Sequence, residues 1–210
     1  MEIMEKLNLL VKISIIKSIY YSIRFKGIIL LGKGSRINIK KNGKIKLSKN
    51  GKLLIGINFS VPIPTVVDIY QNGVFTINGM VRINKGCKIM IGPDASLIIN
   101  NNTYINEFSR IQCRKSIVVG KDCAISWNVD IIDSDEHQLM STNNFSEKYN
   151  QISIGNNVWI GLKAIILKGS VIEDNVIIGA AALVKGHCIN SGLYVGVPCK
   201  LIKNNVKWKR

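Results

Sequence analysis

The feature that most constrains the fold is an isoleucine at every sixth residue in the second half of the chain. The residues that keep this spacing are Ile154, Ile160, Ile166, Ile172 and Ile178. Small or β-branched residues follow four positions after each of them: Val158, Ala164, Ser170, Val176 and Ala182. A helix repeats every 3.6 residues and a strand every two, so neither alone keeps a period of six. A parallel β-helix does, because each flat side uses about six residues and ends in a tight corner of small or Gly/Asn residues.

The same period recurs upstream, so the repeat organises most of the chain. It is present in three triplets: Ile77, Ile83 and Ile89; Ile105, Ile111 and Ile117; Val119, Ile125 and Ile131. We interpret the Gly-, Lys- and Ile-rich stretch 33–58 as earlier, degenerate coils. Coils of this kind bury their interior only against their neighbours and must stack. The predicted fold class is therefore all-β, a parallel β-helix; the alternative is a β-sandwich of short strands, which needs no fixed residue type at every sixth position.

Two segments interrupt the repeat. Residues 2–26 carry apolar residues at helical spacing, among them Leu7, Leu10 and Ile13, and predict a short N-terminal helix. Residues 133–151 (DSDEHQLMSTNNFSEKYNQ) are polar and predict one loop that protrudes from a corner of the coil. The expected organisation is an N-terminal helical segment at 1–30, the β-helix at 31–203 with its loop, and a C-terminal tail at 204–210.

The charge and the cysteines limit the environment and the partners of the chain. Lys and Arg number 29 against 13 acidic residues, a net charge of +16. This excess suits phosphate-rich cofactors, acidic polysaccharides, membrane headgroups or nucleic acid. No helix-turn-helix, RRM or zinc-finger signature is present, so we expect no nucleic-acid partner. Five cysteines without a C-x-x-C pair predict reduced thiols, no structural metal and a cytoplasmic location.

The N-terminus predicts neither a spanning helix nor a signal peptide. Lys12, Lys17, Arg24 and Lys26 interrupt its apolar residues, so no run of about 18 uncharged residues exists. A basic amphipathic segment of this kind could lie on an anionic membrane surface, at the inner face of the membrane. The alternative, which we favour, is a helix that caps the open end of the coil and covers a strand edge.

One histidine lies in the predicted polar loop. His137 follows Asp133 and Asp135 in a D-x-D-x-H arrangement. An imidazole titrates near neutral pH and can act as a general base toward a hydroxyl group. One of these two carboxylates can hold the imidazole in one tautomer, although a solvated loop carboxylate is an equal alternative. The other histidine, His187, is expected at the surface.

At these residues the sequence resembles a known family. The run ISIGNNVWIGLKAIILKGSVIEDNVIIGAAALVKG, followed by YVGVPCKLIK, resembles the left-handed β-helix acetyltransferases with hexapeptide repeats, which include the galactoside, maltose, capsule and lipopolysaccharide O-acetyltransferases. The resemblance implies a left-handed coil, acetyl-CoA as the acetyl donor, and a homotrimer with active sites between neighbouring chains. It also implies that His137 is the catalytic base, that Trp159 lies beside the catalytic site, and that Asn106 contacts the acceptor. Capsule-type relatives have similar D-x-H patterns, so we select Asp135 as the carboxylate that orients the imidazole.

The resemblance further implies positions for the coenzyme. Backbone amides near Leu162 and Ala180 match positions that hold the pantetheine arm. Lys185 and Gly186 occupy a corner where relatives carry Thr-Lys, with the lysine shifted by one position. Lys200 and Lys203 match basic positions that face the CoA phosphates, and lysine there acts as a point charge.

The predicted function is therefore an O-acetyltransferase for a sugar hydroxyl, in a capsular or other surface polysaccharide, which could be acidic, or in its precursor. An amino-sugar N-acetyltransferase and an antibiotic acetyltransferase remain open, as does a non-catalytic β-helix for binding or assembly. A γ-type carbonic anhydrase shares the coil but needs three histidine ligands for zinc, and this chain contains two histidines.

Overall fold

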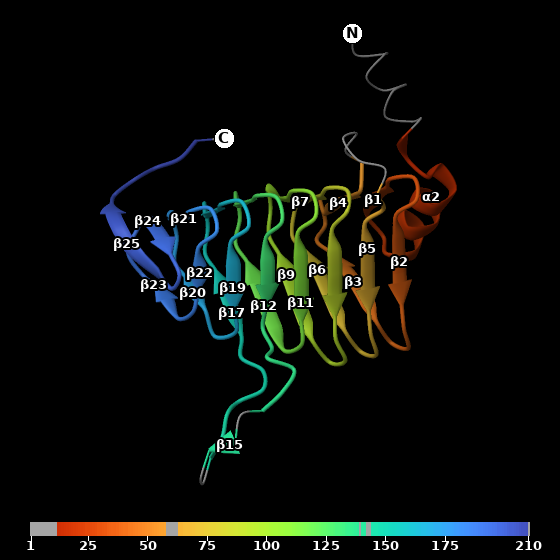
Figure 1. The fold of residues 1–210 in the computed structure, drawn as a ribbon. Helices are drawn as coiled ribbons and strands as arrows, with labels where there is room; N and C mark the ends of the chain where they lie inside the picture. Colours follow the sequence, from red (N-terminus) through yellow and green to blue (C-terminus); the bar gives the residue numbers. More distant parts are fainter. Residues whose placement is uncertain (1–11, 58–62, 139, 142–143, 210) are drawn as a thin grey trace.

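The computed structural model describes residues 12–57, 63–138, 140–141 and 144–209, which form three sheets wound into one coil (Figure 1). Sheet 1 contains β1 (Ile28–Leu31), β4 (Lys52–Ile55), β7 (Met80–Ile83), β10 (Thr103–Ile105), β13 (Ala124–Ile125), β18 (Trp159–Ile160), β21 (Val176–Ile178), β24 (Gly192–Gly196) and β25 (Cys199–Asn204). Sheet 2 contains β2 (Arg36–Ile39), β5 (Val66–Ile69), β8 (Lys88–Ile91), β11 (Arg110–Cys113), β14 (Asp130–Ile132), β19 (Ile165–Leu167) and β22 (Leu183–Val184). Sheet 3 contains β3 (Lys44–Leu47), β6 (Val74–Ile77), β9 (Ser96–Ile99), β12 (Ser116–Val119), β17 (Ile152–Ile154), β20 (Val171–Ile172) and β23 (His187–Cys188).

Each turn of the coil contributes one strand to each sheet. Strands that follow one another in the sequence lie in different sheets, and each strand pairs in parallel with its counterpart in the next turn, as β1 pairs with β4 and β4 with β7. The last strand, β25, is the exception, because it turns back and pairs antiparallel with β24. Parallel pairing throughout the coil excludes the β-sandwich and confirms the predicted β-helix.

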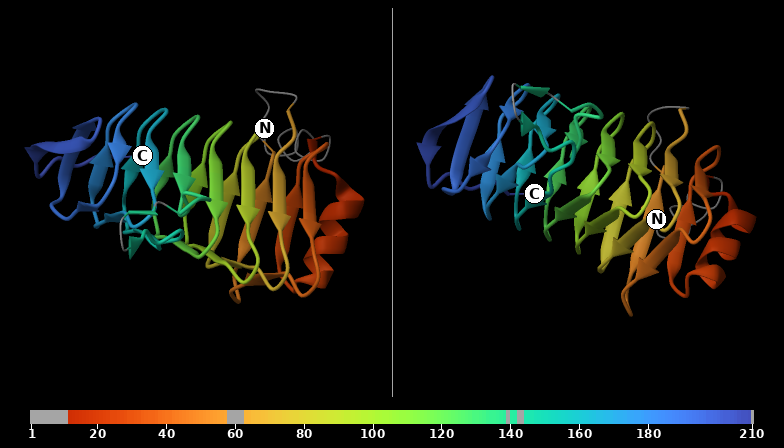
Figure 2. Two further views of the ribbon diagram at one scale, coloured as in Figure 1. Left: turned by 60° about the horizontal axis from the view of Figure 1, so that its bottom comes forward. Right: turned by 90° about the horizontal axis from the view of Figure 1, so that it is seen from below.

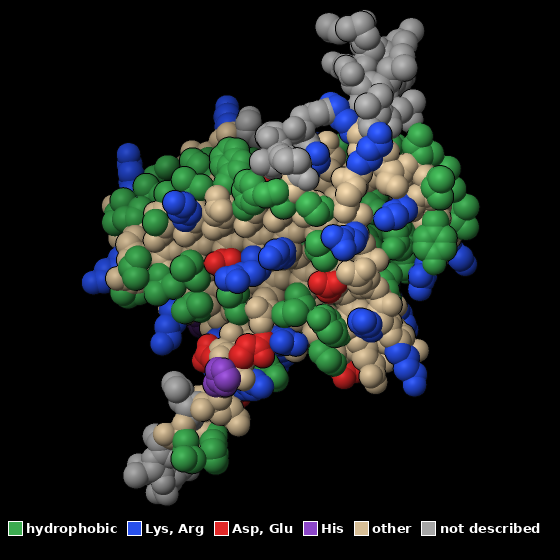
Figure 3. All heavy atoms as spheres, turned by 45° about the vertical axis from the view of Figure 1, so that its right-hand side comes forward, with side chains coloured by type: hydrophobic (Ala, Val, Ile, Leu, Met, Phe, Trp, Pro, Cys, Tyr) green, Lys and Arg blue, Asp and Glu red, His purple; other side chains and the backbone are tan. Residues whose placement is uncertain are grey.

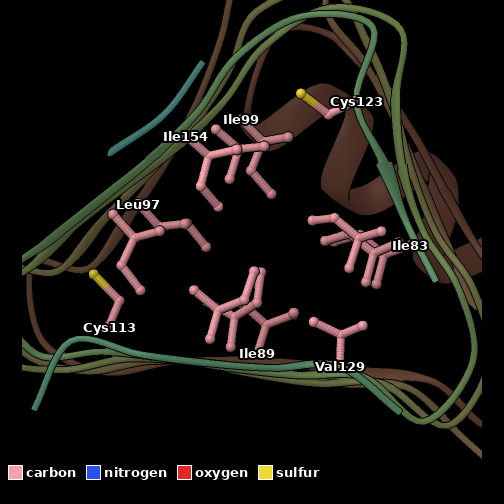
Figure 4. Close-up of a cluster of buried hydrophobic side chains, with 14 of the residues drawn as sticks. Ile83, Ile89, Leu97, Ile99, Cys113, Cys123, Val129 and Ile154 are labelled. Atoms are coloured by element: carbon pink, nitrogen blue, oxygen red, sulfur yellow. The ribbon is translucent and has the colours of Figure 1, made fainter. Parts of the chain in front are cut away.

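The isoleucines of the six-residue repeat fill the interior of the triangle. Ile160, Ile166 and Ile178 have no exposed surface, and Ile154 and Ile172 are almost as buried. The small residues four positions later are buried as well, at Val158, Ala164, Ser170, Val176 and Ala182. Figure 4 shows such side chains converging from the three sides, for example Ile83, Ile89 and Ile99. Removing one of these side chains leaves a cavity that cannot collapse easily, since stacked turns hold its walls, and costs about 2–5 kcal/mol.

The corners explain why Asn and Asp recur in the sequence. Many corner residues have a positive φ, such as Asn42 (57°), Asn72 (56°) and Asp94 (57°), a conformation that Asn and Asp tolerate better than most residues. Their side chains also bond from one turn to the next: Asn72 accepts from Asn42 at 3.2 Å and donates to Asp94 at 2.8 Å. The corners therefore satisfy their own polar groups while the turns stack.

A helix closes the N-terminal end of the coil. Helix α2 (Ile15–Arg24) packs on β1, and the rings of Tyr21 and Phe25 lie against the core. Ser18 is buried and its Oγ accepts from the amide of Leu31 at 3.0 Å. The expectation that this segment caps the open edge is confirmed for α2, while residues 2–11 of the predicted helix lie outside the described residues. None of the described helices is long and apolar enough to cross a membrane.

The predicted protruding loop is present between β14 and β17. It leaves the body of the coil and carries a short hairpin of β15 (Met140–Ser141) and β16 (Asn144–Phe145) (Figures 1 and 2). Its two arms are joined near the base, where the amide of Asp135 donates to the carbonyl of Lys148 at 3.1 Å. A rigid coil thus holds a projecting loop at one corner.

Four of the five cysteines belong to the hydrophobic core, as expected. Cys87, Cys113, Cys123 and Cys188 are buried and Cys199 is half-buried, and all are free thiols. Burial raises the pKa of Cys87 and of Cys188 to about 12 and that of Cys123 to about 11, because the thiolate would lose its hydration. These thiols are therefore neutral at physiological pH and poor nucleophiles.

Candidate active site

The three edges of the triangle separate the predicted site residues into groups. We call the corner between sheets 1 and 2 edge 1/2, and the corner between sheets 2 and 3 edge 2/3. The loop 133–151 leaves the coil at edge 2/3, since it connects β14 of sheet 2 to β17 of sheet 3. Asn106, Leu162 and Ala180 lie on edge 1/2, because each follows a strand of sheet 1 and precedes one of sheet 2.

A buried carboxylate anchors the base of the loop. Asp133 has no exposed surface, and its carboxylate accepts the backbone N–H groups of Arg114 at 2.6 Å, Lys115 at 2.8 Å and Ser116 at 2.9 Å. These donors form the corresponding corner of the preceding turn, between β11 and β12. Asp133 therefore ties the loop to its neighbouring turn, and the structure gives it a structural contact instead of one to the imidazole.

Two further acidic residues of the loop, Asp135 and Glu136, pair with basic side chains. Asp135 Oδ2 lies 2.8 Å from the Nζ of Lys168, which follows β19 on the same edge. Glu136 accepts from Arg114 Nε at 2.6 Å and from Gln112 Nε2 at 2.5 Å. Burial opposes ionisation of Glu136, but these hydrogen bonds and the charge of Arg114 prevail and lower its pKa.

His137 lies at the start of the projecting arm. Its side chain is exposed, and its ring makes no hydrogen bond with the residues that the structure describes, Asp135 included. The role of Asp135 as the residue that orients the imidazole stays a prediction, since its carboxylate lies on Lys168 here. An exposed imidazole with no partner can accept a proton from an incoming hydroxyl group.

Edge 1/2 carries a recess of about 310 Å³ on the outer side of sheet 1. Asn106 and Trp159 both line it, so the structure brings the two predicted acceptor residues together. The amide oxygen of Asn106 accepts from Asn84 at 2.9 Å, which leaves its Nδ2 as a donor, and the indole of Trp159 donates to Ser126 Oγ at 3.2 Å. Apolar walls with a few fixed polar groups are typical of small-molecule sites.

The predicted pantetheine positions continue the same edge. Leu162 and Ala180 occupy equivalent places in successive turns, and the amide of Ala181 donates to the carbonyl of Leu162 at 2.7 Å. Among the described residues, neither amide of Leu162 or Ala180 donates to another backbone group. Gly161 beside them is required by the stacking itself, because a Cβ there would lie 2.7 Å from the amide nitrogen of Ala180.

The remaining predicted coenzyme residues lie elsewhere in the chain. Lys185 and Gly186 form a corner at edge 2/3, between β22 and β23, on the side of the His137 loop. Lys200 and Lys203 are exposed on β25, at the end of sheet 1. His187 is exposed on β23, as expected for a surface residue. One protomer therefore does not gather His137, Asn106 and all of the coenzyme positions in one place.

Sequence reasoning missed several residues of the recess, and the repeat could have identified one of them. Trp127 lines the recess and holds the place in its turn that Leu162 and Ala180 hold in theirs. Aligning the turns would have placed it beside the predicted site. Ser126, Tyr104 and Trp208 also line the recess and carried no sequence signal of this kind.

Comparisons with known proteins extend this description. No family model matches the sequence. The chain is 30% identical over 142 residues to a 24.8 kDa protein of the cps region of Klebsiella pneumoniae, covering 67% of this chain and 63% of that protein. It is 33% identical to a polysialic acid O-acetyltransferase of Neisseria meningitidis, over 60% of this chain and 61% of the relative, and 32% identical to the galactoside O-acetyltransferase of Escherichia coli, over 52% and 54%. The chain spans between 52% and 63% of the length of the first three curated relatives it matches.

Solved structures agree with these relatives. The polySia-specific acetyltransferase NeuO superposes with a TM-score of 0.58 at 26% identity, covering 83% of each chain. The polysialic acid O-acetyltransferase OatWY gives 0.62 at 23% identity, over 83% of this chain and 90% of that one, and shows the same fold. The chain has the fold of the left-handed β-helix acyltransferases with hexapeptide repeats, and its relatives include sugar and polysaccharide O-acetyltransferases. The coil is accordingly left-handed, as the resemblance implied.

Proposed function

We propose that the chain is an acetyl-CoA-dependent O-acetyltransferase that acts on a sugar hydroxyl of a capsular or other surface polysaccharide, or of its precursor. The observation that carries this proposal is edge 1/2, where the recess with Asn106 and Trp159 continues into the stacked backbone of Leu162 and Ala180. A sugar bound in the recess lies next to a thioester bound along the edge. The relatives named above include sugar and polysaccharide O-acetyltransferases, and these support the choice of reaction.

His137 supplies the proton transfer. Acetyl-CoA provides the acetyl group as a thioester. As the sugar hydroxyl oxygen forms its bond to the acetyl carbon, His137 removes the hydroxyl proton, and it returns this proton to the departing sulfur. Asn106 holds the acceptor through its Nδ2, and Trp159 provides an apolar wall.

The separation of the two edges supports a site shared by two chains. Within one protomer His137 belongs to edge 2/3, and the recess belongs to edge 1/2. The loop projects away from its own coil, where it can reach a neighbour (Figure 1). We therefore propose a homotrimer in which each loop, with Lys185 and Gly186 of the same edge, faces edge 1/2 of the next chain. Lys200 and Lys203 provide positive charge for the phosphates of the coenzyme.

The outer face of α2 supports a location at the inner surface of a membrane. Ile16 and Ile23 are 84% and 74% exposed, and hydrophobic side chains gather at this end of the coil with Lys and Arg around them (Figure 3). An apolar face flanked by Lys17 and Arg24 suits an anionic bilayer. The free thiols are consistent with the cytoplasmic side.

The test is an acceptor screen with acetyl-CoA. Purified protein is incubated with neutral sugars, acidic oligosaccharides and amino sugars, and the release of free CoA thiol is measured. We expect release that depends on an acceptor hydroxyl and a product ester that mild alkali removes. Acetylation of an amino group alone would instead identify an N-acetyltransferase, and no release with any acceptor would contradict the proposal.

A further inference from the structure

The C-terminal tail, residues 205–209, runs back along the coil after β25 (Figure 1). Trp208 lies on the outer side of sheet 1, where its indole Nε1 donates to the carbonyl of Asn157 at 3.0 Å. Its ring lies 6.1 Å from the ring of Trp159, tilted by 46°. The tail is thus held by two contacts to the turn that carries Trp159.

These contacts place the tail at the recess of edge 1/2. Trp208 and Lys209 both line it, together with Trp127 and Trp159, which are 49% and 41% exposed. Three tryptophans from three separate segments therefore surround one opening of about 310 Å³. Aromatic faces exposed to water favour a ligand that covers them. The indole N–H groups of Trp159 and Trp208 are already hydrogen-bonded, so the faces of these rings can contact C–H groups of a ligand.

We propose that the tail completes the acceptor site, with Trp208 as a wall for the ring of a sugar and Lys209 as the partner of its carboxylate. The proposal rests on the acetyltransferase function proposed above and names the acceptor class, a carboxylate-bearing pyranose. The apolar face of the ring lies against Trp208 and Trp159. The hydroxyl groups meet polar groups already in the recess, the Nδ2 of Asn106 and the hydroxyl of Ser126.

The charge of the recess supports an acidic sugar. Among the residues that line the recess, Lys209 carries the formal charge. A neutral sugar would leave this ammonium group without a counter-charge at the opening, whereas a carboxylate would pair with it. Lys207 lies two residues away on the same tail, is exposed and does not line the recess, so it provides a matched control.

The test measures binding directly, without acetyl transfer. The probes are the methyl glycosides of glucuronic, galacturonic and N-acetylneuraminic acid, each paired with its own methyl ester, so that members of a pair differ in charge. Tryptophan fluorescence and saturation-transfer NMR report binding to the full chain. We expect at least one acid to bind, Trp208→Ala to weaken it about tenfold, and Trp208→Phe to weaken it less, because the apolar ring is kept.

Lys209→Gln separates the role of the charge from that of the ring. We expect it to reduce the preference for the acid over its ester about threefold, with the ester itself bound as before, and Lys207→Gln to change neither. Binding unchanged in both Trp208→Ala and Lys209→Gln, or no binding of any probe to the wild-type chain, would overturn the proposal. Circular dichroism melting at the wild-type temperature confirms that the variants are folded.

Turnover distinguishes this inference from the proposed function. If wild-type protein releases thiol from acetyl-CoA with an acceptor, Trp208→Ala should raise KM for the acceptor about tenfold and leave KM for acetyl-CoA within about twofold. Normal acceptor KM in the tail variants refutes the inference and leaves the function standing. Sugar binding by the wild-type chain without any thiol release refutes the function and leaves the sugar site standing.

Discussion

Asp133 should determine whether the catalytic loop keeps its place on the coil. Its buried carboxylate accepts three backbone N–H groups from the preceding turn, at 2.6, 2.8 and 2.9 Å. Asp133→Ala removes all three acceptor contacts, and the donors stay in a partly buried corner. Because His137 lies four residues further along the same arm, loss of this anchor should also displace the imidazole.

The expected loss follows from the number and type of the bonds. A hydrogen bond to a charged acceptor contributes about 1.5–3 kcal/mol, but bonds that share one carboxylate are not additive. We therefore expect Asp133→Ala to lower the free energy of unfolding by about 3–5 kcal/mol. Asp133→Asn keeps one oxygen acceptor, for which we expect a smaller loss of about 1–3 kcal/mol.

Urea unfolding measures this loss, with Asp135 as the control. At about 3 kcal/mol per M urea, Asp133→Ala should lower the midpoint by about 1 M or more, at one fixed protein concentration. Asp135→Ala removes an ion pair between partly exposed side chains and should cost about 0–1 kcal/mol. Equal losses for the two variants, or a loss below about 1 kcal/mol for Asp133→Ala, would refute the anchoring role.

Four further predictions follow from the site, the core and the helix. His137→Ala should leave the oligomer folded, as seen by gel filtration, but remove nearly all acetyl transfer; retained activity would place the base elsewhere. Lys200→Gln and Lys203→Gln should weaken CoA binding in calorimetry at low salt more than at high salt, and equal binding constants would remove these lysines from the phosphate site. The buried thiols, whose pKa burial raises from 9.0 to about 11–12, should react slowly with a disulfide reagent at pH 8 and rapidly in urea. The unfolded chain releases the protons of these thiols at a lower pH than the folded chain does. The buried thiols should therefore stabilise the fold below about pH 9, and this contribution should disappear as the pH rises toward 12. Ile16→Asp or Ile23→Asp should abolish sedimentation with anionic vesicles; wild-type protein that stays in the supernatant would exclude the membrane contact.

Much of the fold was predictable because one physical rule acts at every turn. Most inward positions hold an aliphatic side chain, so Ile154 and its counterparts reveal the period without any structure. The projecting loop was predictable for the opposite reason, since residues 133–151 are polar and lack the six-residue period. The recess was only half predictable: the resemblance indicated Asn106 and Trp159, but Trp127 gave no signal until the turns were aligned.

The two neighbouring carboxylates of the loop show what could not be predicted from the sequence. Asp133 and Asp135 are equivalent in the motif, and sequence reasoning gave the choice between them no physical basis. The structure separates them, because the path of the chain buries Asp133 under the corner of the preceding turn and leaves Asp135 beside Lys168. Which carboxylate is structural thus depends on a contact between turns, not on spacing along the chain.

The sequence by itself determined the coil, its interior and the place where the loop interrupts it, since these depend on a local period that each turn repeats. Only the tertiary structure decided which edge each polar residue reaches, because the edge depends on how many residues each earlier corner uses. It alone placed Trp208 on Trp159, 49 residues away in the sequence, since stacking and the return of β25 bring the tail to sheet 1.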